Sequence, residues 1–264
     1  MRLDLMSITA VEAHLASGRR GIILPLGSLE QHGAPGLIGT DAICAQAVAD
    51  RAAGLAGGIA APVLAFGQAQ FHLGRAGTIS LRPATLAAVI ADCITSLGLG
   101  GFTRILLLTG HGGNIAPAQV AMQEVMAEVS MGRLRFPHPV SAKLRAWWEG
   151  PRVQGLRRDL YGEREGFHAT PSEIAMTMAL HPDLAMPPEA WPPFRAMSAD
   201  PLHDAGGDRH HDAARHRAAF PDGVVGSDPS LACPEHGAAL LDAAAADLAE
   251  TFAAFEAAAD HPSR

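Results

Sequence analysis

The chain has 264 residues, of which 48% are hydrophobic and 18% are charged, and its formal net charge is −7 with the histidines neutral. This composition is typical of a globular protein and argues against disorder. A mildly acidic chain does not favour nucleic acid or an anionic membrane as a partner, since both select basic patches. The length fits a single domain over residues 1–264, with two smaller domains as the alternative.

Cysteine usage and the N-terminus predict the compartment. Cys44, Cys93 and Cys233 are widely spaced, which indicates neither a disulfide framework nor a metal knuckle. We expect small buried hydrophobic residues in a reducing compartment. The first 18 residues lack the apolar core and cleavage site of a signal peptide, and no apolar run approaches the ~20 residues of a membrane span. The sequence therefore predicts a cytoplasmic protein.

Strands and helices are expected to alternate along the first half of the chain. Short apolar runs predict strands buried on both faces, and longer Ala-rich stretches bounded by Gly or Pro predict helices. In chain order we expect a helix at 8–18, a strand at 21–26, a helix at 41–55, a strand at 59–66 weakened by Pro62, a Gly-rich loop at 67–77, a helix at 83–97, a strand at 104–110 and a helix at 116–129.

The second half is less regular. Residues 134–141 indicate another strand, residues 143–170 are polar and mixed, and helices are expected at 171–180 and 235–258. The stretch 182–233, rich in Pro, His, Asp and Gly, predicts long loops. The alternation predicts an α/β protein with a three-layer α/β/α arrangement around a central, mostly parallel sheet. In such sheets ligands bind beyond the carboxyl ends of the strands.

Polar side chains follow two of the predicted strands. GSLEQHGAPGLIGTD (27–41) carries Glu30, His32 and Asp41, and HGGN (111–114) carries His111 between glycines. Because both loops follow strands, they could converge on one side of the sheet. Asp41 could equally cap a helix, and His111 could be an incidental residue of a Gly-rich turn.

A third segment, HATPSE (168–173), adds His168 and Glu173. With Pro171 as the first helical residue, Glu173 lies in the first turn, where a carboxylate is favourable without any metal. Its functional interpretation is a metal carboxylate, with His168 as an acid/base group. Two histidines and three carboxylates form a mixed N/O set that suits Zn²⁺, Mn²⁺ or Fe²⁺ and is large enough for two ions. Such a centre activates water for hydrolysis.

The order of GSLEQHG…TD, TGHGGN and HATPSE resembles the creatininase (creatinine amidohydrolase) family, and GTISL (77–81) and GVVGSDPSLA (223–232) extend the resemblance over roughly residues 20–245. It implies a creatininase-like α/β fold, a dinuclear divalent centre and a homohexamer. The residue roles that it implies are metal ligation by Glu30, His32, Asp41, His111 and Glu173, with Asp41 bridging, and catalysis by His168 as proton shuttle together with Glu173.

Departures from the family pattern fall near the expected metals. Creatininases carry Glu in the second motif where this chain has Gly113, which puts creatinine as substrate in doubt. APGLIG (34–39) lacks the family's second His. QFHLGRAG (70–77) matches the usual Glu-His only loosely through His72, and Thr170-Pro171 is atypical. We therefore expect an altered substrate pocket, and the loss of one metal stays an alternative.

The sequence predicts a metal-dependent amidohydrolase that cleaves a C–N amide bond, such as a cyclic amide or formamide, of a small polar substrate. The alternatives are a peptidase of a peptide-derived cofactor precursor, a lyase, and a catalytically idle, metal-stabilised scaffold or sensor. Trp147 and Trp148 could cover a substrate or anchor a subunit interface. A polar loop or subunit contact, rather than a metal site, is expected for His203, Asp204, Asp208, His210, His211, Asp212 and His216.

Overall fold

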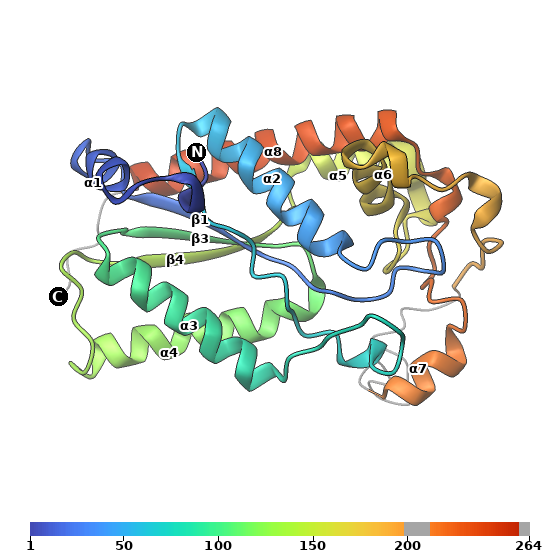
Figure 1. Ribbon diagram of the computed structural model, residues 1–264, viewed down its shortest axis with the longest axis horizontal. Coiled ribbons are helices and arrows are strands. Elements are labelled where there is room, and N and C mark those ends of the chain that lie inside the picture. The colour runs from blue at the N-terminus through green and yellow to red at the C-terminus, as the bar shows by residue number, and fades with distance from the viewer. Residues whose placement is uncertain (198–211, 259–264) are drawn as a thin grey trace.

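A four-stranded parallel sheet forms the centre of the computed structural model, which describes residues 1–197 and 212–258 (Figure 1). The strand order is β2-β1-β3-β4. The inner strands β1 (Gly21–Leu26) and β3 (Arg104–Thr109) are buried at every residue, as expected for apolar strands covered on both faces. The edge strands are β2 (Ile59–Ala60) and β4 (Ser141–Ala146). The predicted α/β class with a parallel central sheet is confirmed.

Helices cover both faces of the sheet. Figure 1 shows α2, α5, α6 and α8 on one face and α3 and α4 on the other. Alternate strand residues serve the two layers, since Leu106 and Leu108 pack toward α8 while Ile105 and Leu107 pack toward α3. The helices are α1 (Ile8–Ala16), α2 (Thr40–Ala56), α3 (Pro83–Leu99), α4 (Ile115–Ser130), α5 (Pro151–Tyr161), α6 (Pro171–Leu180), α7 (Ala213–Ala219) and α8 (Pro234–Ala257).

Four predictions need correction, the first being the stretch 182–233, which was expected to be loops but contains the short helix α7. The strand expected at 59–66 is cut to two residues, because Pro62 cannot donate to the ladder. The strand expected at 134–141 begins only at Ser141, since that segment contains two prolines. Helix α5 lies in the region expected to be irregular. Its apolar positions are few, and Pro151 at its first position is the signal that could have located it.

The carboxyl ends of the inner strands lead directly into the loops that carry the polar motifs. The backbone N–H of Gly110 donates to the Leu26 carbonyl (2.8 Å), which joins the ends of β3 and β1. A Cβ at Gly110 would lie 2.2 Å from the Asp41 carbonyl oxygen, so only glycine lets the loop after β3 pass this close to the start of α2. This contact places Asp41 beside His111. Within the described part of the chain, no helix has the length and hydropathy that a membrane crossing needs.

Candidate metal centre

Six predicted site residues gather at the carboxyl ends of the strands. Glu30 and His32 follow β1, Asp41 lies in the first turn of α2, His111 follows β3, and His168 and Glu173 lie just before and within the first turn of α6. All six side chains are at most 12% exposed. Segments separated by more than 130 residues in the sequence therefore contribute to one buried polar cluster.

Ligand atoms in this cluster form three overlapping groups in which all atoms lie within 4.8 Å of one another. The first group contains Glu30, His32 and His168. The second contains Glu30, Asp41 and His111, and the third contains His32, Asp41 and Glu173. Asp41, Glu30 and His32 each belong to two groups, so the cluster has more than one position with three converging donors.

Asp41 lies between two histidines. Its Oδ1 is 3.3 Å from His32 Nε2, and its Oδ2 is 3.4 Å from His111 Nδ1. The His111 Nδ1 atom is also 3.2 Å from Glu30 Oε1, and His32 Nε2 is 4.0 Å from Glu173 Oε1. The two oxygens of Asp41 thus face different sets of neighbours.

Backbone carbonyls fix which ring nitrogen faces the cluster. His32 Nδ1 donates to the Glu30 carbonyl (3.0 Å), and His111 Nε2 donates to the Gln68 carbonyl (2.8 Å). The other nitrogen of each ring therefore faces the carboxylates, and in the neutral ring this nitrogen would offer its lone pair to a cation, as in metal-ligating histidines. Among the described residues, no hydrogen-bond partner exists for His32 Nε2, Glu30 Oε1 or Asp41 Oδ2. Because buried polar atoms are costly without a partner, this donor set fits a divalent cation.

The protonation of the two histidines also supports a cation site. Burial alone would lower the pKa of His32, but the nearby charges of Asp41, Glu173 and Glu30 raise that pKa to about 10. Burial would also lower the pKa of His111, but the charges of Glu30 and Asp41 outweigh it and raise that pKa to about 9. Metal-free protein at neutral pH thus holds protons on both rings, which a bound metal would displace.

His168 is in a different electrostatic state. Burial and the nearby His72 and His32 rings hold the pKa of His168 well below its usual value. Its Nε2 donates to the Gln31 carbonyl (2.7 Å), and its Nδ1 lies 3.5 Å from Glu30 Oε1. The ring is therefore neutral at pH 7, with a lone pair directed to the edge of the cluster.

Glu173 combines the two interpretations that the sequence left open. Its Oε1 accepts a hydrogen bond from the Thr170 backbone N–H (2.6 Å), and its own N–H donates to Thr170 Oγ1 (3.3 Å), which completes a capping box at the start of α6. The same Oε1 lies within 4.0 Å of His32 Nε2. Burial raises the pKa of this carboxyl. Glu173 is thus both a helix-start charge and a member of the cluster.

Sequence reasoning assigned no role to two further residues that contact the cluster. His72, on the 3-10 helix Gln70–His72, is fully buried, and its Nε2 lies 3.8 Å from Glu30 Oε1. Its ring centroid lies 4.2 Å from that of His168, with the two ring planes inclined by 36°. The side-chain Nε2 of Gln31 lies between them, 3.0 Å from His72 Nδ1 and 3.1 Å from His168 Nε2. The loosely matched QFHLGRAG was the only signal for His72.

The remaining predicted features lie away from the cluster or only beside it. Trp147 is 3% exposed and belongs to the hydrophobic core, so it neither covers the cluster nor projects from the surface. His216 is buried on α7 against His72, and Asp212 caps that helix. The other members of the His/Asp-rich stretch, at 203–211, lie outside the described residues. Cys44, Cys93 and Cys233 are free.

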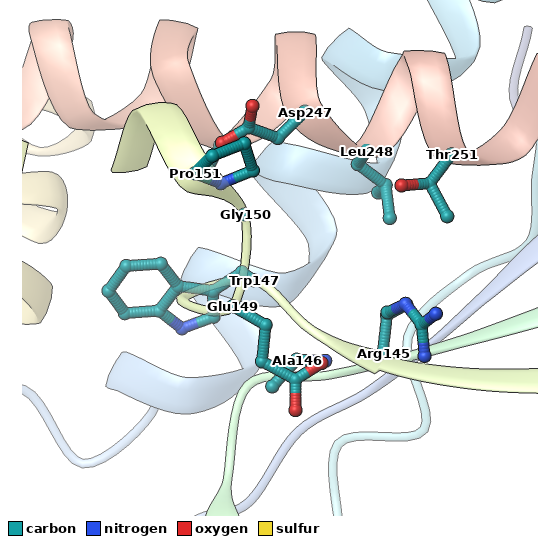
Figure 2. A pocket seen from close by; sticks show the side chains of 10 residues that line it. Arg145, Ala146, Trp147, Glu149, Gly150, Pro151, Asp247, Leu248 and Thr251 are labelled. Carbon is teal, nitrogen blue, oxygen red and sulfur yellow. The ribbon is translucent and has the colours of Figure 1, made fainter. Parts of the chain in front are cut away.

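A cavity of ≈200 Å³ opens between the end of β4 and α8 (Figure 2). It is lined by Arg145, Trp147, Glu149 and Asp247 among others, and by none of the six clustered side chains. The Asp247 carboxylate there accepts the backbone N–H groups of Arg152 (2.9 Å) and Val153 (3.0 Å) and so caps α5. This cavity is separate from the candidate metal centre.

The fold and the cluster together define an α/β protein with a candidate divalent-metal site at the carboxyl ends of its strands. A sequence model described as creatininase, creatinine amidohydrolase, matches residues 4–252, and the chain belongs to this family of hydrolases. The resemblance seen in the three motifs is therefore confirmed.

The chain is similar to two kinds of curated protein and to solved creatininase structures. A creatinine amidohydrolase from Pseudomonas putida is 29% identical over 210 residues, which cover 72% of this chain and 78% of the relative. A mycofactocin precursor peptide peptidase from Mycobacterium ulcerans (strain Agy99) is 33% identical over 129 residues, or 46% of this chain and 51% of that protein. The crystal structure of a creatinine amidohydrolase (creatininase) superposes with a TM-score of 0.81 at 25% identity over 98% of both chains. A point-mutant creatininase of the Zn-Zn type gives 0.77 at 25% identity over 95% of this chain and 96% of the other.

Proposed function

We propose that this protein is a metal-dependent hydrolase that cleaves a C–N amide bond of a small polar substrate. The observation that carries the proposal is the overlap of three buried donor groups through Glu30, His32 and Asp41, with one atom of each lacking a hydrogen-bond partner among the described residues. The Zn-Zn type of the creatininase with 25% identity supports two metals rather than one.

The geometry supports a particular division of ligands. Glu30, Asp41 and His111 would hold one ion, and His32, Asp41 and Glu173 the other, since Asp41 belongs to both donor groups and its two oxygens face different histidines. Divalent ions in such a site supply a water of lowered pKa and a Lewis acid for the carbonyl oxygen. Glu173 then compensates for Gly113, which stands where creatininases carry a glutamate.

His168 is the proposed acid/base residue. The Gln31 carbonyl holds its Nε2–H, so Nδ1 has a free lone pair at the edge of the cluster. Its lowered pKa keeps the ring neutral and able to accept a proton from the attacking water. The same nitrogen can then return that proton to the leaving nitrogen, which completes C–N cleavage without a second acid.

The two kinds of relative indicate two candidate classes of substrate. The creatinine amidohydrolase relative covers most of the chain, which favours a cyclic or small linear amide. The mycofactocin precursor peptide peptidase is more similar over a shorter stretch, which keeps a peptide-derived precursor as the second candidate. Both substrates present an amide carbonyl and a nitrogen leaving group, so the proposed roles of the residues are common to them.

Metal content and turnover test the proposal. Purified protein is expected to carry a divalent metal at up to two ions per chain, and chelation should abolish hydrolysis of a panel of cyclic amides, formamides and short peptides. His168→Ala should keep the metal and lose turnover, while His138→Ala, at an exposed position, should change neither. ¹⁸O from labelled water should enter the product. A metal-free protein whose Asp41→Ala variant is unchanged would refute the proposal. Metal binding without any turnover would instead identify an idle scaffold, and product without ¹⁸O would identify a lyase.

Two expectations about the whole molecule remain part of the proposal. A homohexamer would be measured by light scattering of the eluting protein, and cytoplasmic location by fractionation of the producing cells. Neither outcome alters the assignment of ligands within one chain.

A further inference from the structure

The amide of Gln31 has a single orientation because backbone groups anchor both of its ends. Its Oε1 accepts the N–H of Gly33 (3.0 Å), and its Nε2 donates to the Gly223 carbonyl (3.0 Å). A backbone N–H can only donate and a carbonyl can only accept, so oxygen and nitrogen cannot be exchanged. One proton of the Gln31 Nε2 group remains for a further acceptor.

That acceptor is His72. Gln31 Nε2 lies 3.0 Å from His72 Nδ1 and 3.1 Å from His168 Nε2. His168 Nε2 already donates to the Gln31 carbonyl and has no lone pair to offer. The remaining proton of Gln31 therefore goes to His72 Nδ1, and the neutral His72 ring carries its hydrogen on Nε2.

His72 differs in this respect from the other three imidazoles. In their neutral, metal-binding forms His32, His111 and His168 direct lone pairs into the cluster, whereas neutral His72 directs an N–H. The distance from His72 Nε2 to Glu30 Oε1 is 3.8 Å, which is longer than a hydrogen bond but within the range of electrostatic attraction. A ring with this tautomer and an acceptor bond at Nδ1 is not arranged as a ligand.

We propose that His72 is a positioning residue that, held as the Nε2–H tautomer by Gln31, keeps the Glu30 carboxylate and the His168 ring in place. The inference rests on the proposed metal-dependent function. Glu30 Oε1 is the oxygen that His111, His168 and His72 all approach, at 3.2, 3.5 and 3.8 Å. An N–H on one side of this oxygen directs the carboxylate, and the ring contact at 4.2 Å between centroids restrains the His168 ring.

The tautomer can be measured directly. In zinc-loaded protein with ¹⁵N-labelled histidine, long-range ¹H–¹⁵N correlation should show a protonated Nε2 and an unprotonated Nδ1 for His72, assigned by its loss in His72→Phe. Gln31→Glu removes the amide N–H and should move the proton to Nδ1. A wild-type His72 protonated on Nδ1 would overturn the inference. The metal-free protein gives the same readout and keeps the test valid if zinc does not bind.

Zinc affinity separates positioning from packing. His72→Phe keeps an aromatic ring but removes both nitrogens, and it should weaken zinc binding about 10–100-fold in competition with a chelator, the usual effect of removing an outer partner of a ligand. His72→Gln restores an N–H near the Nε2 position and should recover most of this loss. Phe71→Leu, at the neighbouring buried residue, is the control for packing and should leave zinc affinity within about threefold of wild type.

The outcomes distinguish this inference from the proposed function. If wild-type protein binds no zinc or other divalent metal, the proposed function fails. If wild-type protein binds zinc and His72→Phe binds it equally well, or if Phe71→Leu weakens it as much as His72→Phe, the positioning role is wrong while the proposed function stands.

Discussion

Asp41→Asn removes one negative charge from the centre of the cluster and keeps the size of the side chain. In metal-free protein Asp41 faces His32 Nε2 at 3.3 Å and His111 Nδ1 at 3.4 Å, and it is 3% exposed. Two unit charges at this distance attract by about 5 kcal/mol at an effective dielectric constant of about 20. Removing one partner of a buried pair costs about 3–5 kcal/mol, because the other charge stays buried and unpaired. We expect a loss of this size in the free energy of unfolding at pH 6.5.

The pH dependence has a definite sign. The pKa of His32 is about 10 in the folded protein and about 6.5 in the unfolded chain, so the folded state holds its proton more tightly. The stabilisation is therefore complete below pH 6.5 and is lost as the pH rises toward about 10. The difference in stability between wild type and Asp41→Asn should shrink over the same interval, since the charge that Asp41 stabilises disappears.

Urea unfolding of chelator-treated protein at pH 6.5, 8 and 9.5 measures both effects. Asp92→Asn makes the same chemical change at an exposed position of α3 and should alter stability by less than about 0.5 kcal/mol at every pH. Zinc at about 100 times its dissociation constant should add about 2.7 kcal/mol to the wild type and less to Asp41→Asn. Equal stability of wild type and Asp41→Asn at pH 6.5, or a difference that stays constant to pH 9.5, would refute the reasoning.

Three further substitutions test the loops that carry the site. Ala169 is buried with a φ of +52°, so Ala169→Gly should cost about 1–2 kcal/mol less in unfolding free energy than Ala175→Gly in the regular helix that follows; equal costs would mean the backbone is not strained. Thr170→Val should cost about 1 kcal/mol by breaking the capping box and Thr170→Ser much less, and identical melting of the two would contradict a capping role. Gly223→Ala places a Cβ on the Gln31 amide at a φ of +80° and should destabilise by more than about 1 kcal/mol; an unchanged urea midpoint would show that the loop can move.

The sequence was sufficient where local and global signals agree. The inner strands and most of the helices follow from continuous apolar runs and from Gly and Pro at the boundaries. The proximity of Glu30, Asp41 and His111 could be predicted from the sequence. Each lies in a loop that follows a strand or at the start of a helix, and the carboxyl ends of parallel strands open on one side of a sheet. Strand β4 was misplaced because its alternating, partly exposed residues do not look like a buried strand.

The position of His72 could not be derived in this way. It lies on an irregular segment after β2, and its orientation depends on Gln31, 41 residues away, which is in turn held by Gly223, 192 residues away. No periodicity or spacing in the sequence predicts the position of His72, because the contact needs two other loops, which carry Gln31 and Gly223. The environment of Trp147 could not be predicted for a similar reason. Its burial against α8 and its cation–π contact with Arg157 arise only when the layers pack together.

Glu173 shows why a local structural role and a functional role need not compete. The capping box takes one lone pair of Oε1 through the Thr170 N–H, and a carboxylate has about four such positions. The hydrogen bond therefore leaves donors for a cation on the side that His32 faces. It also fixes the rotamer, so the carboxylate loses little further freedom when it binds. The position of Glu173 in the first turn of α6, which by itself indicates only a capping role, thus also preorganises its carboxylate as the proposed metal ligand.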